Sequence, residues 1–139
     1  MLRSGIEQDE GSVLLLTLGY VLLALAVIFV CVCATDLYIA QKRLDALADS
    51  AALAGADGFT LAVRDGTVRA ELTDAFVEEQ ADALVAALPG EASLVAAGTP
   101  DGVTARITVA GEWHPPLVSL FVPEGVPLES TATSRTALR

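Results

Sequence analysis

Residues 11–35 read GSVLLLTLGYVLLALAVIFVCVCAT and are followed, without a proline, by DLYIAQKRLDALADSAALAGAD at residues 36–57. The first part contains no charged residue, and as a helix its 25 residues extend roughly 37 Å, enough to cross a hydrocarbon core of about 30 Å. The second part consists mainly of strong helix formers. The sequence therefore predicts a transmembrane helix over residues 11–35 that continues as a helix over residues 36–62.

The residues before the apolar stretch distinguish a permanent anchor from a secretory signal. A signal peptide has a basic leader and an apolar core of about 7 to 15 residues. Here residues 1–10 read MLRSGIEQDE, with one arginine against three acidic residues, and the apolar stretch is longer than a signal core. We therefore expect a single-pass anchor that is retained, preceded by a short polar tail over residues 1–10.

Length and charge limit what lies beyond the anchor. The chain has 139 residues and a formal net charge of -10. Beyond residue 35 there are 15 acidic and seven basic residues, so this part carries -8, and the whole chain has one lysine. Proteins that neutralise nucleic-acid phosphates need clustered lysine and arginine. The composition predicts one small acidic head domain over residues 36–139 and excludes nucleic acid as a partner.

An apolar seam follows the predicted helix out of the membrane. Its residues recur at spacings of three and four, which is typical of a helix that packs on another element. The seam consists of Leu37, Ala40, Leu44, Leu47, Ala51 and Ala54. Because many of them are small, a second helix could approach closely. The seam is therefore predicted either to pack laterally on a partner helix or to cover the chain's own head, and one helix can do both along its length.

The remaining sequence predicts an α+β head. Asp65-Gly66-Thr67 is interpreted as a turn that starts a second helix over residues 67–88, ended by Pro89-Gly90. From residue 92 the apolar period changes to two, which predicts strands over residues 92–98 and 103–111. Residues 126–138, which are rich in threonine and serine, are interpreted as a last strand. The expected fold is α+β and pilin-like: a long N-terminal helix, transmembrane and continuing into the head, with a second helix packed on a small antiparallel sheet.

Few residues have the pattern of a reactive site. His114 is the only histidine, so no histidine-based catalytic or metal cluster can form, and we predict a structural role for it. Cys31 and Cys33 lie in the span and point about 200° apart on a helix, which favours packing over a disulfide between them; acylation or an intermolecular disulfide is the alternative. An acidic cluster on the second helix is interpreted as a solvated face rather than a cation site: Glu78, Glu79 and Asp82. We expect no enzymatic activity, no cofactor and no bound metal.

The order of residues after the span resembles a known family. The pattern is an Asp, an aromatic residue and an Arg, followed by Leu-x-x-Ala-x-Asp-x-Ala-Ala-Leu-Ala. The matching residues in this chain are Asp36, Tyr38, Arg43, Leu44, Leu47, Asp49, Ala51, Ala52, Leu53 and Ala54. Over about residues 9–57 the chain resembles TadE/TadG-like proteins, the pilin-like components of bacterial tight-adherence (Flp) pilus assembly.

The resemblance implies a role in assembly. It predicts a pilin-like accessory component, a minor pilin or pseudopilin, of Flp pilus assembly or a related secretion machine. Its partners would be other pilin-like subunits and the membrane platform, in a hetero-oligomer. The family places the head outside the cytoplasmic membrane, whereas Lys42 and Arg43 just beyond the span favour a cytoplasmic head; we follow the family. The alternative function is a membrane-tethered extracytoplasmic module that binds a ligand.

Overall fold

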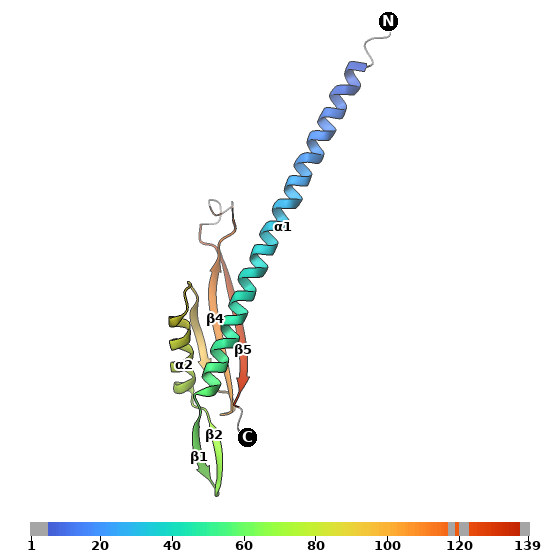
Figure 1. The fold of residues 1–139 in the computed structure, drawn as a ribbon. Helices are drawn as coiled ribbons and strands as arrows, with labels where there is room; N and C mark the ends of the chain where they lie inside the picture. The colour runs from blue at the N-terminus through green and yellow to red at the C-terminus, as the bar shows by residue number, and fades with distance from the viewer. Residues whose placement is uncertain (1–5, 117–118, 120–122, 137–139) are drawn as a thin grey trace. The chain divides into compact units, whose positions relative to one another are not determined.

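The computed structural model describes residues 6–116, 119 and 123–136. The chain forms two compact units, Met1–Asp36 and Leu37–Arg139. The fold is α+β, with a long N-terminal helix, a second helix and small antiparallel sheets, as predicted (Figure 1). In chain order the elements are α1 (Ile6–Asp57), β1 (Thr60–Arg64), β2 (Thr67–Glu71), α2 (Asp74–Ala87), β3 (Ser93–Gly98), β4 (Thr104–Trp113) and β5 (Val126–Arg135).

The first unit contains the apolar part of α1. By length and composition this helix can cross a membrane, since its most apolar window has a mean hydropathy of 2.9 and none of that window is buried. The hydroxyls of Thr17 and Thr35 donate to the carbonyl oxygens of Val13 and Cys31, each at 2.8 Å, so these polar groups are satisfied within the helix. The helix begins at Ile6, so the predicted tail over residues 1–10 is wrong from residue 6 onward; residues 1–5 lie outside the described residues.

The second unit contains a three-stranded antiparallel sheet in the order β3-β4-β5. Alternate residues of the central strand β4, Ala105, Ile107 and Val109, are fully buried. Because successive side chains of a strand point to opposite faces, these three lie on one face of the sheet. In the pairing with β5, Ile107 lies opposite Ala132, which extends the buried face to the edge strand. The core of the head is built on this face.

Helix α2 covers part of that face. Its buried residues Val77, Ala81 and Val85 recur every four positions, so they form one stripe along the helix. At its N-terminal end, the Asp74 carboxylate accepts a hydrogen bond of 2.7 Å from the backbone N–H of Thr99. This bond ties the start of α2 to the turn between β3 and β4.

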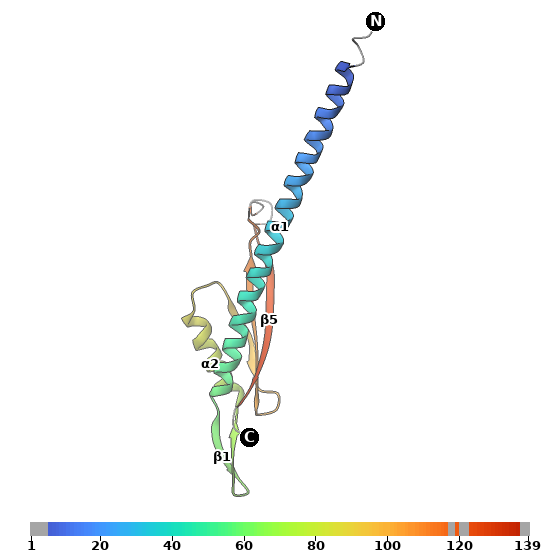
Figure 2. The ribbon, with the colours of Figure 1, turned by 45° about the vertical axis from the view of Figure 1, so that its right-hand side comes forward.

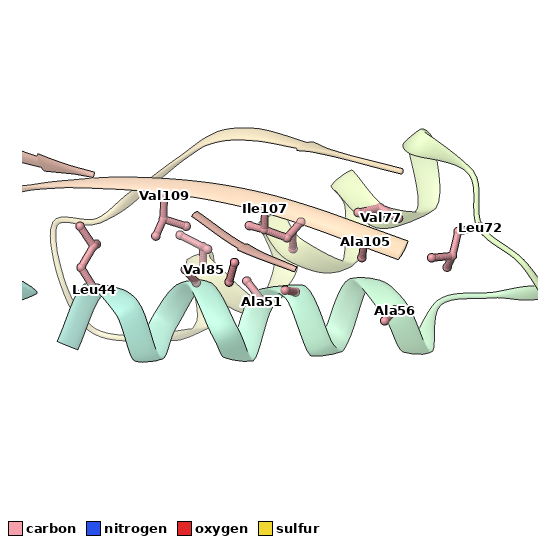
Figure 3. Packing of buried hydrophobic residues seen from close by; sticks show 13 residues of the cluster. Leu44, Ala51, Ala56, Leu72, Val77, Val85, Ala105, Ile107 and Val109 are labelled. Carbon is pink, nitrogen blue, oxygen red and sulfur yellow. The ribbon is translucent and has the colours of Figure 1, made fainter. Parts of the chain in front are cut away.

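The part of α1 in the second unit packs on the same core (Figure 3). Its buried residues are Leu44, Ala48, Ala51, Ala52 and Ala56. Close approach to α2 depends on Gly55, since a Cβ there would lie 3.1 Å from the Cγ1 of Val77 and 3.4 Å from the Cβ of Ala105. The small residues of α1 therefore allow α1, α2 and the three-stranded sheet to pack together around Ile107.

The region between the helices differs from the prediction. Helix α1 ends at Asp57 rather than residue 62, and residues 67–71 form β2 rather than the first turns of a helix. Strands β1 and β2 pair as a hairpin with Val63 opposite Val68 (Figure 2). Asp65 and Gly66 have φ of 54° and 76°, both in the left-handed region that a tight two-residue hairpin turn requires. The alternation of apolar and polar residues around this turn explains why the segment is extended.

The strand bounds also differ at their ends. β4 extends to Trp113, two residues beyond the predicted end at 111, because it pairs with β5 over its whole length. β5 ends at Arg135, which is opposite Thr104, the first residue of β4. Beyond this point the backbone N–H of Thr136 donates to the Val103 carbonyl oxygen at 3.0 Å, and residues 137–138 of the predicted strand lie outside the described residues.

Candidate functional site

The predicted seam lies on the face of α1 that meets the chain's own head. Leu44 and Ala51 belong to the hydrophobic core, and Leu47 packs against it while remaining half-buried. Leu37, Ala40 and Ala54 are also half-buried. The structure thus brings the seam together with the sheet and α2. Leu44 and Ala51 therefore cover the chain's own head, which was one of the two alternatives for the seam. Lateral packing on a partner helix through the other seam residues stays a prediction.

A polar clasp holds this part of α1 to β5. The Asp45 carboxylate accepts hydrogen bonds from Lys42 Nζ at 2.9 Å, Gln41 Nε2 at 3.0 Å and Ser130 Oγ at 2.8 Å. These donors, with Lys42 first, lower the pKa of the Asp45 carboxyl to about 2, and the same pairing raises the pKa of Lys42. Gln41 also donates to the Glu129 carbonyl oxygen at 3.2 Å. The clasp stabilises the position of the seam in the head.

Beside the clasp lies a groove of about 610 Å³. Its apolar lining includes Leu47 of α1, Leu88 at the end of α2 and Leu128 of β5, and its acidic lining residues are Glu91 and Glu112. The remaining lining residues are Ala40, Arg43, Leu44, Ala46, Ser50, Pro89, Gly90, Ala92 and Gly111. Sequence reasoning missed this groove because its walls come from four separate segments. Three seam residues, Ala40, Leu44 and Leu47, line it.

A second apolar stripe lies on the exposed side of α1 in the head, and one of its residues, Ala46, also lines the groove. Ile39, Ala46 and Leu53 recur every seven residues, and all three are exposed. A seven-residue repeat keeps residues on one side of a helix. Sequence reasoning missed this stripe, although its spacing is visible in the sequence. It is the face that a neighbouring helix can contact without disturbing the core.

The β1–β2 hairpin is a further surface that sequence reasoning missed. Leu61 and Val63 alternate along β1, and their partners on β2 are Ala70 and Val68. Ala70 is buried, whereas Leu61, Val63 and Val68 are exposed. Hydrophobic side chains that share one face of a paired strand and remain exposed mark a surface for interaction. The Asp-Gly pair between alternating residues was the signal for this hairpin.

The candidate residues for chemistry are Cys31, Cys33, His114 and the carboxylates of α2. Within residues 6–116, 119 and 123–136, no three His, Cys, Asp or Glu side chains are placed to hold a metal ion. Cys31 and Cys33 are free thiols, the first exposed and the second half-buried. His114 is exposed at the end of β4, where its Nε2 lies 3.1 Å from the position that a Cβ on Gly125 would occupy. Three carboxylates predicted to form a solvated face, Glu78, Glu79 and Asp82, are exposed on α2.

Comparison with known proteins identifies the segment that contains the span and the seam. No curated protein and no solved structure matches the chain. A family model, described as Tad, Putative Flp pilus-assembly TadE/G-like, matches residues 11–58. The match includes the whole apolar segment and every seam residue, and it ends just before β1. The resemblance inferred from the residues after the span is therefore confirmed, and residues 11–58 of this chain match the TadE/G-like family of Flp pilus assembly.

Proposed function

We propose that this protein is a pilin-like accessory component, a minor pilin or pseudopilin, of Flp pilus assembly or a related secretion machine. The observation that carries the proposal is the family match over residues 11–58, which supports involvement in Flp pilus assembly. The matched segment is helical to Asp57 and leaves most of its apolar side chains exposed over residues 13–32. The role is structural and non-enzymatic, and its partners are other pilin-like subunits and the membrane platform.

The mechanism is lateral packing of α1 on neighbouring helices. Beyond the span, the outward stripe of Ile39, Ala46 and Leu53 is the contact face. Two half-buried seam residues, Leu47 and Ala54, lie between this stripe and the buried face and would border the contact. Small Ala46 at the centre of the stripe allows a second helix to approach. Burying a leucine such as Leu53 stabilises an interface by about 1.5–3 kcal/mol.

The charged residues next to the stripe limit which helices can pack there. Lys42, Arg43 and Asp49 are exposed on α1 close to the stripe. Exposed charges of this kind contribute under about 1 kcal/mol each, so they favour or disfavour partners rather than drive association. We therefore propose that the apolar stripe supplies most of the binding free energy for a neighbouring helix. The charged residues beside the stripe would determine which helix binds.

We place the anchor in the cytoplasmic membrane and the head outside the cytoplasm, with incorporation into the pilus as a further step. Two basic residues, Lys42 and Arg43, follow the span and favour the opposite orientation. Long domains nevertheless translocate largely regardless of such a charge bias. Protease added to intact spheroplasts is expected to degrade the head, and full protection of the head would overturn this orientation.

The proposed function is tested by placing a charge on the stripe. Leu53→Glu should abolish co-purification with Flp pilus components, because a buried carboxylate without a partner costs several kcal/mol, while the protein still inserts and folds. Val95→Glu on β3 is the matched control, since Val95 and Leu53 are 55% and 56% exposed. Co-purification measured from membranes should be lost in the first variant and kept in the second. Equal co-purification of both variants with the pilus components would contradict the lateral-packing mechanism.

A further inference from the structure

Strand β4 runs antiparallel to the part of α1 that packs in the head. Near the end of α1, a Cβ on Gly55 would lie 3.4 Å from the Cβ of Ala105, which is near the start of β4. Earlier in α1, the Cδ1 of Leu44 lies 3.5 Å from the position of a Cβ on Gly111, which is near the end of β4. Between these contacts the helix extends about 16 Å and the strand about 20 Å, so the two lie side by side. Strand β4 therefore ends on the side of the head where the chain enters from the apolar part of α1.

Trp113, the last residue of β4, continues this course beyond Leu44. It lies two positions after Gly111, which is about 7 Å along a strand. Asp36 is the first charged residue after the apolar stretch, and it lies about 12 Å from Leu44 along the continuous helix. Measured along α1, Trp113 therefore reaches to within about 5 Å of the level of Asp36.

This distance matches the thickness of a lipid headgroup layer. A hydrocarbon core of about 30 Å becomes about 40–45 Å with both headgroup regions, so each region is roughly 5–8 Å thick. A helical stretch that is longer than the core is accommodated by tilting, which keeps both of its ends at the hydrocarbon edges. The apolar stretch of α1 ends at Thr35. With this stretch in a bilayer, the level of Trp113 along α1 falls in the headgroup layer.

The residues at this end of the head have the chemistry of a membrane interface. Trp113 is the one tryptophan of the chain, and Tyr38, close to Asp36, is one of its two tyrosines. Tyr38 is 62% exposed and its ring centre lies 5.8 Å from Lys42 Nζ, while Trp113 is half-buried. Tryptophan and tyrosine are enriched at membrane–water interfaces, because each has an apolar ring and a polar group that remains hydrated. Two such side chains at the level of the headgroups therefore favour contact with lipid.

The charges near this end do not select an anionic lipid. Recognition of anionic lipids takes clusters of about four to eight Lys or Arg residues. Lys42 is paired with Asp45 at 2.9 Å, and Arg43 is accompanied by the exposed carboxylates of Glu112 and Glu124. The aromatic side chains therefore determine the contact, and a zwitterionic lipid is sufficient for it.

We propose that this end of the head, with Trp113 and Tyr38 as its contact residues, rests in the headgroup layer of the bilayer that α1 spans. The two rings lie among the lipid headgroups, and the acidic remainder of the head stays in water. The contact fixes the height of the head, and with it the outward stripe of α1, relative to neighbouring helices in the same membrane. The inference goes beyond the proposed function and rests on it only for the membrane anchor.

The fluorescence of Trp113 tests this contact without any substitution, because the chain has one tryptophan. The full-length protein is reconstituted in phosphatidylcholine vesicles that contain lipids with a nitroxide quencher, either on the headgroup or near the end of an acyl chain. Trp113 should be quenched about twofold more strongly by the headgroup label than by the acyl-chain label, as expected for an interfacial indole. Equal quenching by both labels, or quenching by neither, would overturn the proposal.

Tryptophans at other heights calibrate the measurement. In a Trp113→Phe background, Tyr20→Trp places the probe in the span and Val68→Trp places it in the β1–β2 hairpin, at positions that are 65% and 54% exposed. The hairpin follows the end of α1 at Asp57, about 31 Å from Asp36 along the helix, so Val68→Trp should not be quenched by either label. Tyr20→Trp should be quenched most strongly by the acyl-chain label.

These variants separate the contact from the anchor on which it rests. If Tyr20→Trp is quenched but Trp113 is quenched no more than Val68→Trp, the surface contact is wrong and the anchor stands. If Tyr20→Trp is not quenched, the anchor and the contact are both wrong.

Tyr38 is tested in the same way. Tyr38→Trp in the Trp113→Phe background should give the depth profile of Trp113, because the two residues lie at neighbouring levels along α1. A profile like that of Val68→Trp would overturn the contact as proposed.

Discussion

The β3-β4-β5 sheet and the β1–β2 hairpin are both antiparallel and both alternate apolar and polar residues, yet their apolar faces differ in exposure. Ile107 and Val109 of β4 are 0% exposed, whereas Val63 of β1 is 71% exposed. The difference lies in what covers each face: α1 and α2 pack on the sheet, whereas Leu61, Val63 and Val68 of the hairpin remain exposed. The same alternating pattern is therefore covered in one region and uncovered in the other.

The largest expected effect is at the covered face. Ile107→Ala should lower the free energy of unfolding by about 2–5 kcal/mol, because it removes buried methyl groups and leaves a cavity where the two helices meet the sheet. Urea unfolding of the full-length protein in detergent, followed by the fluorescence of Trp113 in the head, measures the change. Val95→Ala, on the exposed face of β3, is the control and should change the free energy by under about 0.5 kcal/mol. Similar losses in both variants would mean that the core is not centred on Ile107.

The fold was predictable where one periodicity dominated. The span follows from an uncharged stretch, the second helix from an apolar stripe, and the central strand β4 from the alternation of apolar and polar residues. The hairpin was missed because Asp65-Gly66-Thr67 also fits a helix start. The residues Thr67 to Glu71 alternate too briefly to decide between a strand and a helix. The segment is a strand because it pairs with residues 60–64. The local sequence pattern carries no information on that pairing.

The candidate functional site on α1 was only partly predictable from the sequence, because the sequence does not show which elements pack against each other. The spacing of the seam identifies the residues that pack, and Leu44 and Ala51 do pack, but spacing carries no information on what they pack against. In this head the covering layer is the chain's own sheet. The groove was beyond prediction because Leu47, Leu88 and Leu128 come together only through the tertiary fold. The outward stripe at Ile39, Ala46 and Leu53 was visible in the sequence but was overshadowed by the stronger seam.

A smaller, pH-dependent effect is expected at the clasp that holds α1 to β5. The pKa of Asp45 is lowered from 3.8 to about 2 in the folded protein by its hydrogen bonds from Lys42, Gln41 and Ser130. A depressed folded pKa stabilises the fold above the unfolded pKa, and this stabilisation is lost as the pH falls from about 4 to about 2. The difference in unfolding free energy between the wild type and Asp45→Asn should therefore shrink over this window.

Urea midpoints measured between pH 2 and 7 provide the check on the clasp. Asp82→Asn, which changes an exposed carboxylate on α2, is the matched control and should follow the wild type. If the difference in unfolding free energy between the wild type and Asp45→Asn stays constant from pH 2 to 7, the charge of Asp45 does not contribute to the stability that the clasp provides.

The smallest effect on stability is expected at the uncovered face, and it is the sharpest test of the comparison between the two regions. Val63→Ser removes an apolar side chain that is 71% exposed, so little apolar surface returns to water on unfolding. Its free energy of unfolding should stay within about 0.5 kcal/mol of the wild type, measured as for Ile107→Ala. A loss of stability comparable to that of Ile107→Ala would show that the hairpin face is covered within its own molecule. The comparison between the two regions would then be wrong.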